Sequence, residues 1–197
     1  VHHLTPPSDA TIETRRRSLD LLSRLNAEQL RQHQRRSELE VRIQNYELAA
    51  RMQLEATQVL DVSGETEATR QLYGLDNKVT ENYGKRCLLA RRLVEAGVRF
   101  VQVFPPMPNY QPWDTHNATE SQLKAICPNT DQPSAALIKD LKQRGLLDDV
   151  IVLWTGEFGR LPITENASGR DHNRHAFSLF LAGGGFKGGH VHGATDE

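Results

Sequence analysis

The chain has 197 residues, which is enough for one domain with its own hydrophobic core. Its 24 lysines and arginines balance 25 aspartates and glutamates, and the resulting net charge of -1 excludes a general attraction to nucleic acid or to anionic membranes. No apolar run is long enough to cross a bilayer, and two cysteines do not make a disulfide framework.

The first half of the chain has the apolar spacing of helices. We predict one helical segment over residues 11–36 and a second in which apolar side chains recur at steps of three and four. That stripe consists of Leu39, Ile43, Tyr46, Ala50 and Leu54. The sequence at residues 61–64 breaks the pattern, and a third helix is expected over 77–96, with Gly97 as its C-terminal cap. Residues 1–97 are therefore assigned to a helical segment, either a cap or helices that flank a sheet.

The second half changes its period. Residues 98–104 alternate and are rich in β-branched and aromatic side chains, which predicts a strand. A helix is expected over 134–144, closed by Gly145, and the continuous apolar run 150–154 is typical of a strand buried on both faces. A third strand is predicted at 177–181. This order predicts an α/β domain over residues 98–197, with a mostly parallel sheet.

Side chains that bind metals follow two of these strands. Asp114 and His116 are two residues apart, so in an extended loop both side chains point to one side. They form half of a divalent-metal site, or an aspartate that caps a turn beside a surface histidine. Glu157 follows the apolar strand, where it is either a ligand or the ion-pair partner of Arg160.

A third polar segment precedes the last strand. It contains Asp171, His172 and His175 among arginines, which favours an anion or metal site over an ordinary surface loop. His190 and His192 are more typical of an exposed pair than of ligands. In open α/β sheets, ligands bind beyond the carboxyl ends of strands, so we expect the three polar segments to meet there.

Six segments together resemble one family, the domain-of-unknown-function family 1501, whose members are secreted bacterial proteins often labelled sulfatase-like. The resemblance covers residues 15–197 and is specific because the order and approximate spacing of all six segments agree. The segments are Tyr46-Glu47-Leu48-Ala49, the run from Cys87-Leu88-Leu89 to Arg99-Phe100-Val101, Trp113-Asp114-Thr115-His116, Gly156-Glu157-Phe158-Gly159-Arg160, Gly169-Arg170-Asp171-His172 and Leu181-Ala182-Gly183-Gly184-Gly185.

The resemblance implies the alkaline phosphatase superfamily and a large parallel sheet with helices on both faces. It also implies an export signal and a first metal-binding strand upstream of Val1, and therefore a periplasmic or extracellular protein. The chain begins without methionine and stops after a glycine-rich stretch, so we expect an incomplete domain, the C-terminal part of a longer protein.

The resemblance also implies site residues. Asp114 and His116 look like the family's first metal-binding element, with shorter spacing, and His172 looks like the later histidine of the same site. Glu157 stands where a second-metal element is expected. Phe158, however, occupies the position of a coordinating histidine, so a second ion is altered or absent.

The chemistry implied is hydrolysis of sulfate or phosphate esters, on a small molecule or a polysaccharide, with a zinc, manganese or calcium ion. In this scheme Arg160 holds the anion and His175 protonates the leaving group. The nucleophile is expected upstream, so this chain alone is not expected to turn over substrate. Phe158 favours one alternative, a non-catalytic secreted binding protein with a degenerate metal site. Another alternative, a nucleic-acid-binding helical protein, rests on arginine clusters that acidic neighbours dilute.

Overall fold

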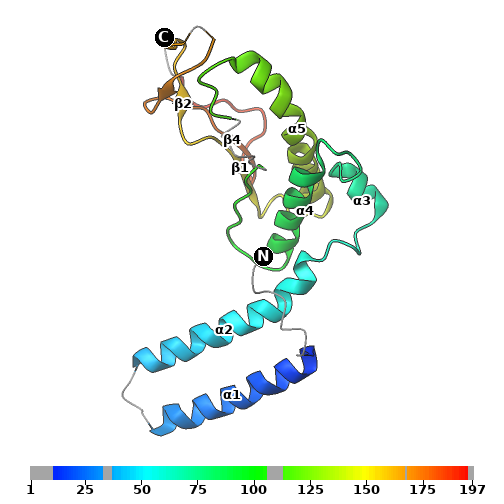
Figure 1. The fold of residues 1–197 in the computed structure, drawn as a ribbon, viewed down its shortest axis with the longest axis vertical. Coiled ribbons are helices and arrows are strands. Elements are labelled where there is room, and N and C mark those ends of the chain that lie inside the picture. The colour runs from blue at the N-terminus through cyan, green and yellow to red at the C-terminus, as the bar shows by residue number, and fades with distance from the viewer. Residues whose placement is uncertain (1–10, 33–36, 106–112, 167, 195–197) are drawn as a thin grey trace. The chain divides into compact units, whose positions relative to one another are not determined.

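The computed structural model describes residues 11–32, 37–105, 113–166 and 168–194 (Figure 1). The chain divides into two compact units, Val1–Gly64 and Glu65–Glu197. The structure combines helices with small antiparallel sheets. Within the described ranges, none of the helices combines the length and the apolar character that a membrane crossing needs.

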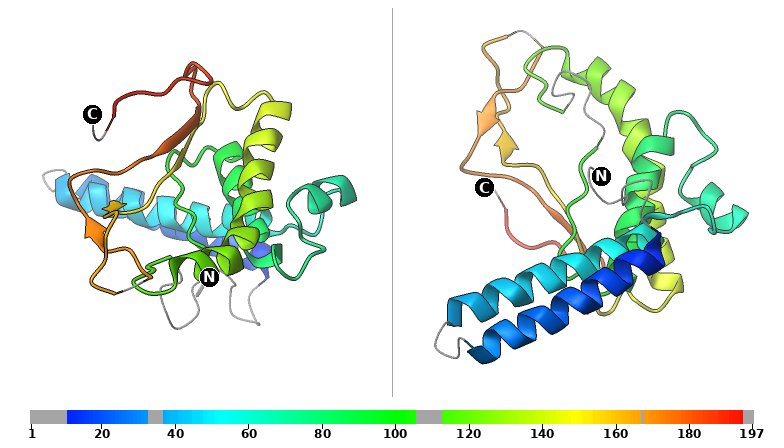
Figure 2. Two further views of the ribbon diagram at one scale, coloured as in Figure 1. Left: turned by 90° about the horizontal axis from the view of Figure 1, so that it is seen from above. Right: turned by 60° about the horizontal axis from the view of Figure 1, so that its bottom comes forward.

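The first unit contains two helices, α1 (Ile12–Gln32) and α2 (Ser37–Leu60), which run back along each other (Figures 1 and 2). The Thr11 hydroxyl accepts a hydrogen bond from the backbone N–H of Thr14 and so caps α1. Across the pair, Ser23 donates a hydrogen bond to Glu47 over 2.9 Å. The helix predicted over 11–36 is confirmed as far as Gln32, and residues 33–36 lie outside the described residues. The second predicted helix and the break at residues 61–64 are confirmed.

The second unit is built on α4 (Glu81–Glu95), which packs against α5 (Thr119–Gln143). Gly97 and Gly145 follow these helices with φ of 88° and 70°, the left-handed conformation that ends a helix, so both predicted caps are confirmed. The sequence-based helix over 77–96 is α4 with a later start. Residues 67–72 form a short helix, α3 (Glu67–Leu72), which the sequence pattern did not predict.

α5 begins 15 residues before the helix predicted over 134–144. Pro128 and Pro133 lie inside it, and each removes one helical N–H donor. No helix is predicted from the sequence over residues 119–133, where these prolines lie. Pro133 is fully buried, so its packing against the rest of the unit offsets the lost backbone hydrogen bond.

The hydrophobic core of the second unit lies between α4, α5 and the turn after α3. Its fully buried side chains are Tyr73, Cys87, Leu88, Pro133 and Leu141. Burial raises the pKa of the Cys87 thiol to about 12, so this cysteine is a buried, unreactive thiol.

A buried arginine ties the helices of this unit together. Arg91 on α4 is 2% exposed. Its guanidinium lies 2.8 Å from a carboxylate oxygen of Glu65, 2.5 Å from one of Glu95 and 3.1 Å from one of Asp140 on α5. The contacts to Glu65 and Asp140 lie off the N–H directions, so they are ion pairs rather than aligned hydrogen bonds.

Further groups complete this network. Tyr73 donates a hydrogen bond to Asp140, and Arg144 pairs with the other oxygen of Asp140 at 2.7 Å. Arg92 lies 2.6 Å from Glu65. Burial raises the pKa of Glu65, but Arg92 and Arg91 outweigh it, so the pKa lies below its usual value. The carboxylate of Glu65 is therefore charged and paired.

The strands differ from the expected sheet. β1 (Ile151–Trp154) pairs antiparallel with β4 (Phe180–Gly183), in the register Leu153 to Leu181. β2 (Gly159–Arg160) pairs antiparallel with β3 (His172–Asn173). The strand expected at 150–154 is confirmed, and the one expected at 177–181 begins at Phe180. The pairing is antiparallel, because both connections return as loops rather than through a crossover helix.

Residues 98–104 are not a strand, contrary to their alternating pattern. Phe100 is 78% exposed, and in the described part of the chain no strand pairs with this segment. Its end is held instead by Arg86 on α4, whose guanidinium donates to the carbonyl of Phe104 over 2.9 Å. An alternating pattern makes a strand only where a neighbour supplies the hydrogen-bond ladder.

β1 is also less buried than expected. Ile151, Leu153 and Trp154 are 55%, 55% and 52% exposed, although their run was predicted to be covered on both faces. A two-stranded ribbon has no layers to cover it.

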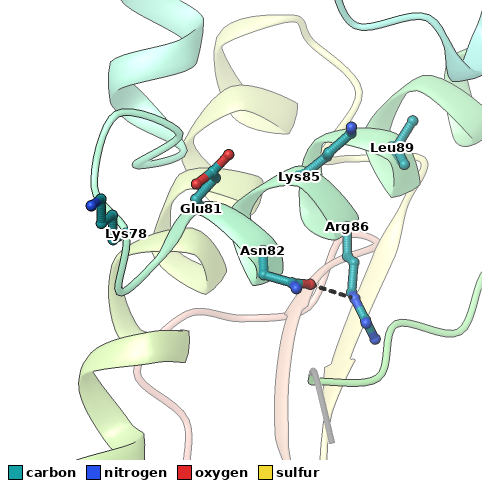
Figure 3. A pocket seen from close by; sticks show the side chains of 6 residues that line it. All are labelled: Lys78, Glu81, Asn82, Lys85, Arg86 and Leu89. Carbon is teal, nitrogen blue, oxygen red and sulfur yellow. Dashed lines mark hydrogen bonds between the residues drawn. The ribbon is translucent and has the colours of Figure 1, made fainter. Parts of the chain in front are cut away.

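A shallow depression of about 470 Å³ lies along the exposed side of α4 (Figure 3). Its lining consists of Lys78, Glu81, Asn82, Lys85, Arg86 and Leu89. The guanidinium of Arg86 donates hydrogen bonds to Asn82 and to the carbonyl of Phe104, so it links α4 to the segment that follows the helix.

The Arg91 network predicts a large stability effect. Replacing Arg91→Met leaves buried carboxylates without their shared cation and should lower the free energy of unfolding by about 3 kcal/mol, the low end for a broken buried pair, because Arg92 and Arg144 remain. Urea unfolding followed by circular dichroism measures it. The control Lys124→Met removes an exposed pair with Glu120 on α5 and should change that free energy by less than about 0.5 kcal/mol. Equal effects would contradict a buried network.

Candidate metal centre

Two loops far apart in the sequence are joined by backbone hydrogen bonds. The N–H of Arg170 donates to the carbonyl of Thr115 over 3.1 Å, and the N–H of Thr119 donates to the carbonyl of Ser168 over 3.0 Å. Thr119 is the first residue of α5. The start of α5 therefore anchors both loops, and residues 114–116 lie beside residues 171–172.

Gly169 allows these loops to approach so closely. A Cβ at this buried position would lie 1.7 Å from the carbonyl oxygen of His116, a distance that no side chain tolerates. Glycine is used where one backbone must pass directly over another. The position of His116 therefore depends on a residue that is not itself a candidate ligand.

Three metal-binding side chains converge at this junction. Oδ1 of Asp114 lies 2.8 Å from Nε2 of His172 and 3.1 Å from Nε2 of His116. The two histidine Nε2 atoms lie 3.2 Å apart. The three residues form a group that can hold a metal ion, with ligand atoms all within 4.8 Å of one another.

The spacing suits a first-row divalent ion. Ligand atoms that surround a zinc-type ion tetrahedrally at about 2.0–2.2 Å lie about 3.3–3.6 Å from one another. Two observed separations, 3.1 and 3.2 Å, are close to that range, and the third, 2.8 Å between Asp114 and His172, is a hydrogen-bond distance that would widen around an ion. Two imidazoles and one carboxylate are a donor set that zinc and manganese accept.

Asp171 orients the ring of His116. Its Oδ1 lies 3.3 Å from Nδ1 of His116. A charged carboxylate only accepts hydrogen bonds, so the hydrogen of the neutral ring belongs on Nδ1 and Nε2 is left as a bare lone pair. This carboxylate–histidine arrangement is the one that orients histidine ligands in metal sites.

The consequence is a local conflict between acceptors. In that tautomer Nε2 of His116 faces Oδ1 of Asp114 at 3.1 Å, and two acceptors at that distance repel each other unless a proton or a metal cation lies between them. A metal cation shared by Asp114, His116 and His172 would satisfy all three atoms at once, so the arrangement is compatible with a metal centre.

Asp171 is itself held in place. The N–H of Glu165 donates to its Oδ2 over 2.8 Å, and Thr164 donates to its Oδ1. The backbone hydrogen bond from Glu165 is the main cause of a lowered pKa for Asp171. From the sequence, only the neighbouring His172 was expected to be a ligand, and the adjacency of Asp171 and His172 was the signal for a role of Asp171.

Arg160 lies next to the ligands because of strand register. In the β2–β3 pair Arg160 stands opposite His172, and directly opposite residues carry their side chains on one face. Nη1 of Arg160 lies 2.6 Å from Oδ1 of Asp114. Hydrogen bonds from His172 and then Arg160 lower the pKa of Asp114 to about 2, which keeps this ligand charged at neutral pH.

The other predicted site residues lie outside the three-ligand group. Glu157 pairs with Arg160 at 3.2 Å and is exposed, so its role as a ligand stays a prediction. His175 is exposed and accepts a hydrogen bond from Arg174; none of its hydrogen bonds within the described ranges reaches the three ligands. Its role as an acid stays a prediction. Phe158 packs against His172, with ring centroids 4.7 Å apart.

A family model matches the whole chain. It is described as "Protein of unknown function (DUF1501)", and the match covers residues 1–197. Neither a curated protein nor a solved structure gives a significant match.

A change at Asp171 tests the orientation of His116. Asp171→Asn keeps the shape but removes the charge that holds the hydrogen on Nδ1, so zinc or manganese should bind about 10–100-fold more weakly in calorimetric titration. Asp131→Asn, an exposed change on α5, should leave the affinity unchanged. Unaltered affinity in the Asp171 variant would exclude this role.

The close approach at Gly169 gives a second test. Gly169→Ala forces the loop away from the His116 carbonyl and should weaken metal binding at least tenfold, as the loss of one oriented ligand does. The control is Gly188→Ala, where a Cβ meets nothing within 4 Å. Calorimetric titration compares the two, and circular dichroism confirms that both variants fold. Wild-type affinity in the Gly169 variant would show that the loop contact does not position His116.

Proposed function

This chain belongs to the DUF1501 family, and we propose that it supplies a divalent-metal centre to a secreted hydrolase that acts on phosphate or sulfate esters. The observation that carries the proposal is the convergence of Asp114, His116 and His172 on one point. The substrate class comes from the arginine beside the ligands and from the sulfatase-like resemblance of the sequence.

The roles of the residues follow from their chemistry. Asp114, His116 and His172 would hold the ion, which when bound stabilises negative charge on the transferring group and lowers the pKa of a nucleophile. Arg160 would bind the anionic oxygens through its guanidinium, which is planar and always charged. His175 would give a proton to the leaving oxygen, because imidazole titrates near neutral pH.

The finer fold belongs to the same proposal. In an alkaline-phosphatase-like architecture the β1–β4 ribbon would lie within a larger, mostly parallel sheet, and further strands would cover Ile151, Leu153 and Trp154. The exposure of these three side chains supports such a sheet, since apolar strands of this composition are normally buried on both faces. A periplasmic or extracellular location and a nucleophile outside this chain are part of the proposal.

One observation favours a second candidate, a secreted binding protein whose metal site is not catalytic. Phe158 lies against His172 and has no atom that can coordinate an ion. A centre restricted in this way to one ion can bind an anionic group without splitting it.

Metal content and ester hydrolysis, measured together, distinguish the hydrolase, the binding protein and the absence of both functions. The chain should bind one zinc or manganese ion, and Asp114→Ala or His172→Ala should abolish binding, as measured by elemental analysis after dialysis. His190→Ala, in the exposed pair with His192, is the control and should keep the ion. The full-length protein should then hydrolyse aryl phosphates or aryl sulfates only with metal. If the protein binds an ion but hydrolyses neither ester, it is the binding protein. If it binds no ion, both proposals are wrong.

A further inference from the structure

We propose that Arg160 makes this centre specific for oxyanions: its charge weakens the hold of the three ligands on the cation and provides the contact that a phosphate or sulfate group needs. The inference rests on the proposed metal centre and goes beyond it. It assigns two opposite effects to the Arg160 side chain: weaker binding of the cation and stronger binding of the oxyanion.

The geometry places Arg160 between two carboxylates. Its Nη1 lies 2.6 Å from Oδ1 of Asp114, and its Nη2 lies 3.2 Å from Oε1 of Glu157. The atom of Asp114 that it contacts is the same one that faces both histidines. Arg160 therefore draws electron density from the ligand oxygen that the cation would use.

The guanidinium also has N–H groups beyond those that bond to Asp114 and Glu157. It has five N–H groups, and the two hydrogen bonds to Asp114 and Glu157 are the only side-chain contacts recorded for it within the described ranges. Glu157 is an exposed partner, so an incoming oxyanion competes with a carboxylate that water already reaches. Phosphate and sulfate oxygens match the spacing of the guanidinium fork.

The net charge of the site also supports a role for Arg160 in binding an anion. Asp114, Glu157 and Asp171 are carboxylates, and Arg160 is the cation recorded in direct contact with two of them. With neutral imidazoles the net charge is -2, which one divalent ion neutralises. Such a neutral site holds an anion well only if a positive group can offer it hydrogen-bond donors, and Arg160 has N–H groups beyond the two that bond to Asp114 and Glu157.

The opposite possibility is that Arg160 only clamps Asp114 in position. In that case its loss would misplace a ligand and weaken metal binding. The two hypotheses therefore predict changes of opposite sign in the affinity for the metal alone, measured before any anion is added.

The experiment uses the full chain and two probes, zinc alone and then inorganic phosphate or sulfate added to zinc-loaded protein. Arg160→Gln, which keeps a donor but removes the charge, should bind zinc about fivefold more tightly, the equivalent of one partly exposed ion pair. It should bind phosphate at least about tenfold more weakly, the loss expected for charge-assisted hydrogen bonds. Arg160→Lys keeps the charge and should retain wild-type affinity for zinc.

Arg99→Gln removes one exposed positive charge elsewhere in the same unit and should leave both affinities within about twofold. The Nε–H signal of Arg160 in nitrogen-15 NMR should shift when zinc is added and again when phosphate follows. If Arg160→Gln weakens zinc binding, leaves it unchanged, or leaves phosphate affinity intact, the inference is wrong. If the wild-type chain binds no zinc, the proposed function fails instead.

Discussion

The guanidinium of Arg91 is buried away from water, and the second unit is organised around the carboxylates that pair with it. A buried guanidinium is stable only when carboxylates surround it, and here they come from three places in the chain: Glu65 before α3, Glu95 on α4 and Asp140 on α5. Each of these positions is thereby constrained relative to the others. The helices form one block, and the core side chains Leu88 and Leu141 are buried within it.

The metal centre is attached to that block through the first turn of α5. Thr119 is the first residue of α5, and its N–H donates to the carbonyl of Ser168. The loop that contains His116 leads directly into the same helix. Residues 58 positions apart, Asp114 and His172, meet as a result. No ligand lies on a helix, so their placement depends on loop-to-loop backbone hydrogen bonds and on the missing side chain of Gly169.

Catalysis and simple binding make the same demand on the three ligands, which is why the ligands alone do not separate the two functions. What separates them is the surroundings. In the proposed function Arg160 would hold an oxyanion, whereas Phe158 packs against His172 with a side chain that has no ligand atom. An arginine beside a single ion would suit recognition of an anionic group, and the proposed turnover needs a nucleophile that the three ligands do not supply.

Features that depend on a few adjacent residues were predictable. Gly97 and Gly145 end their helices as expected, because glycine takes the left-handed conformation at little cost. Residue type and spacing made Asp114 and His116 candidate ligands, the family resemblance added His172, and the structure brings the ligand atoms of all three together. The resemblance to the DUF1501 family, carried by six short segments, agrees with the match over residues 1–197.

Features that depend on distant neighbours were not predictable. Residues 98–104 alternate like a strand, but a strand needs a partner ladder, and none is supplied to them within the described ranges. The apolar pattern predicted a helix only over 134–144, yet α5 begins at Thr119 and continues through Pro128 and Pro133, and Pro133 is buried in the core. Asp171 became a site residue only once His116 lay beside it. The sequence by itself determined which residues carry the candidate chemistry and where helices end, because these depend on local conformation. The tertiary structure alone decided the strand direction, the contact between His116 and Asp171 and the pairing of Arg160, because these depend on groups that only folding brings together.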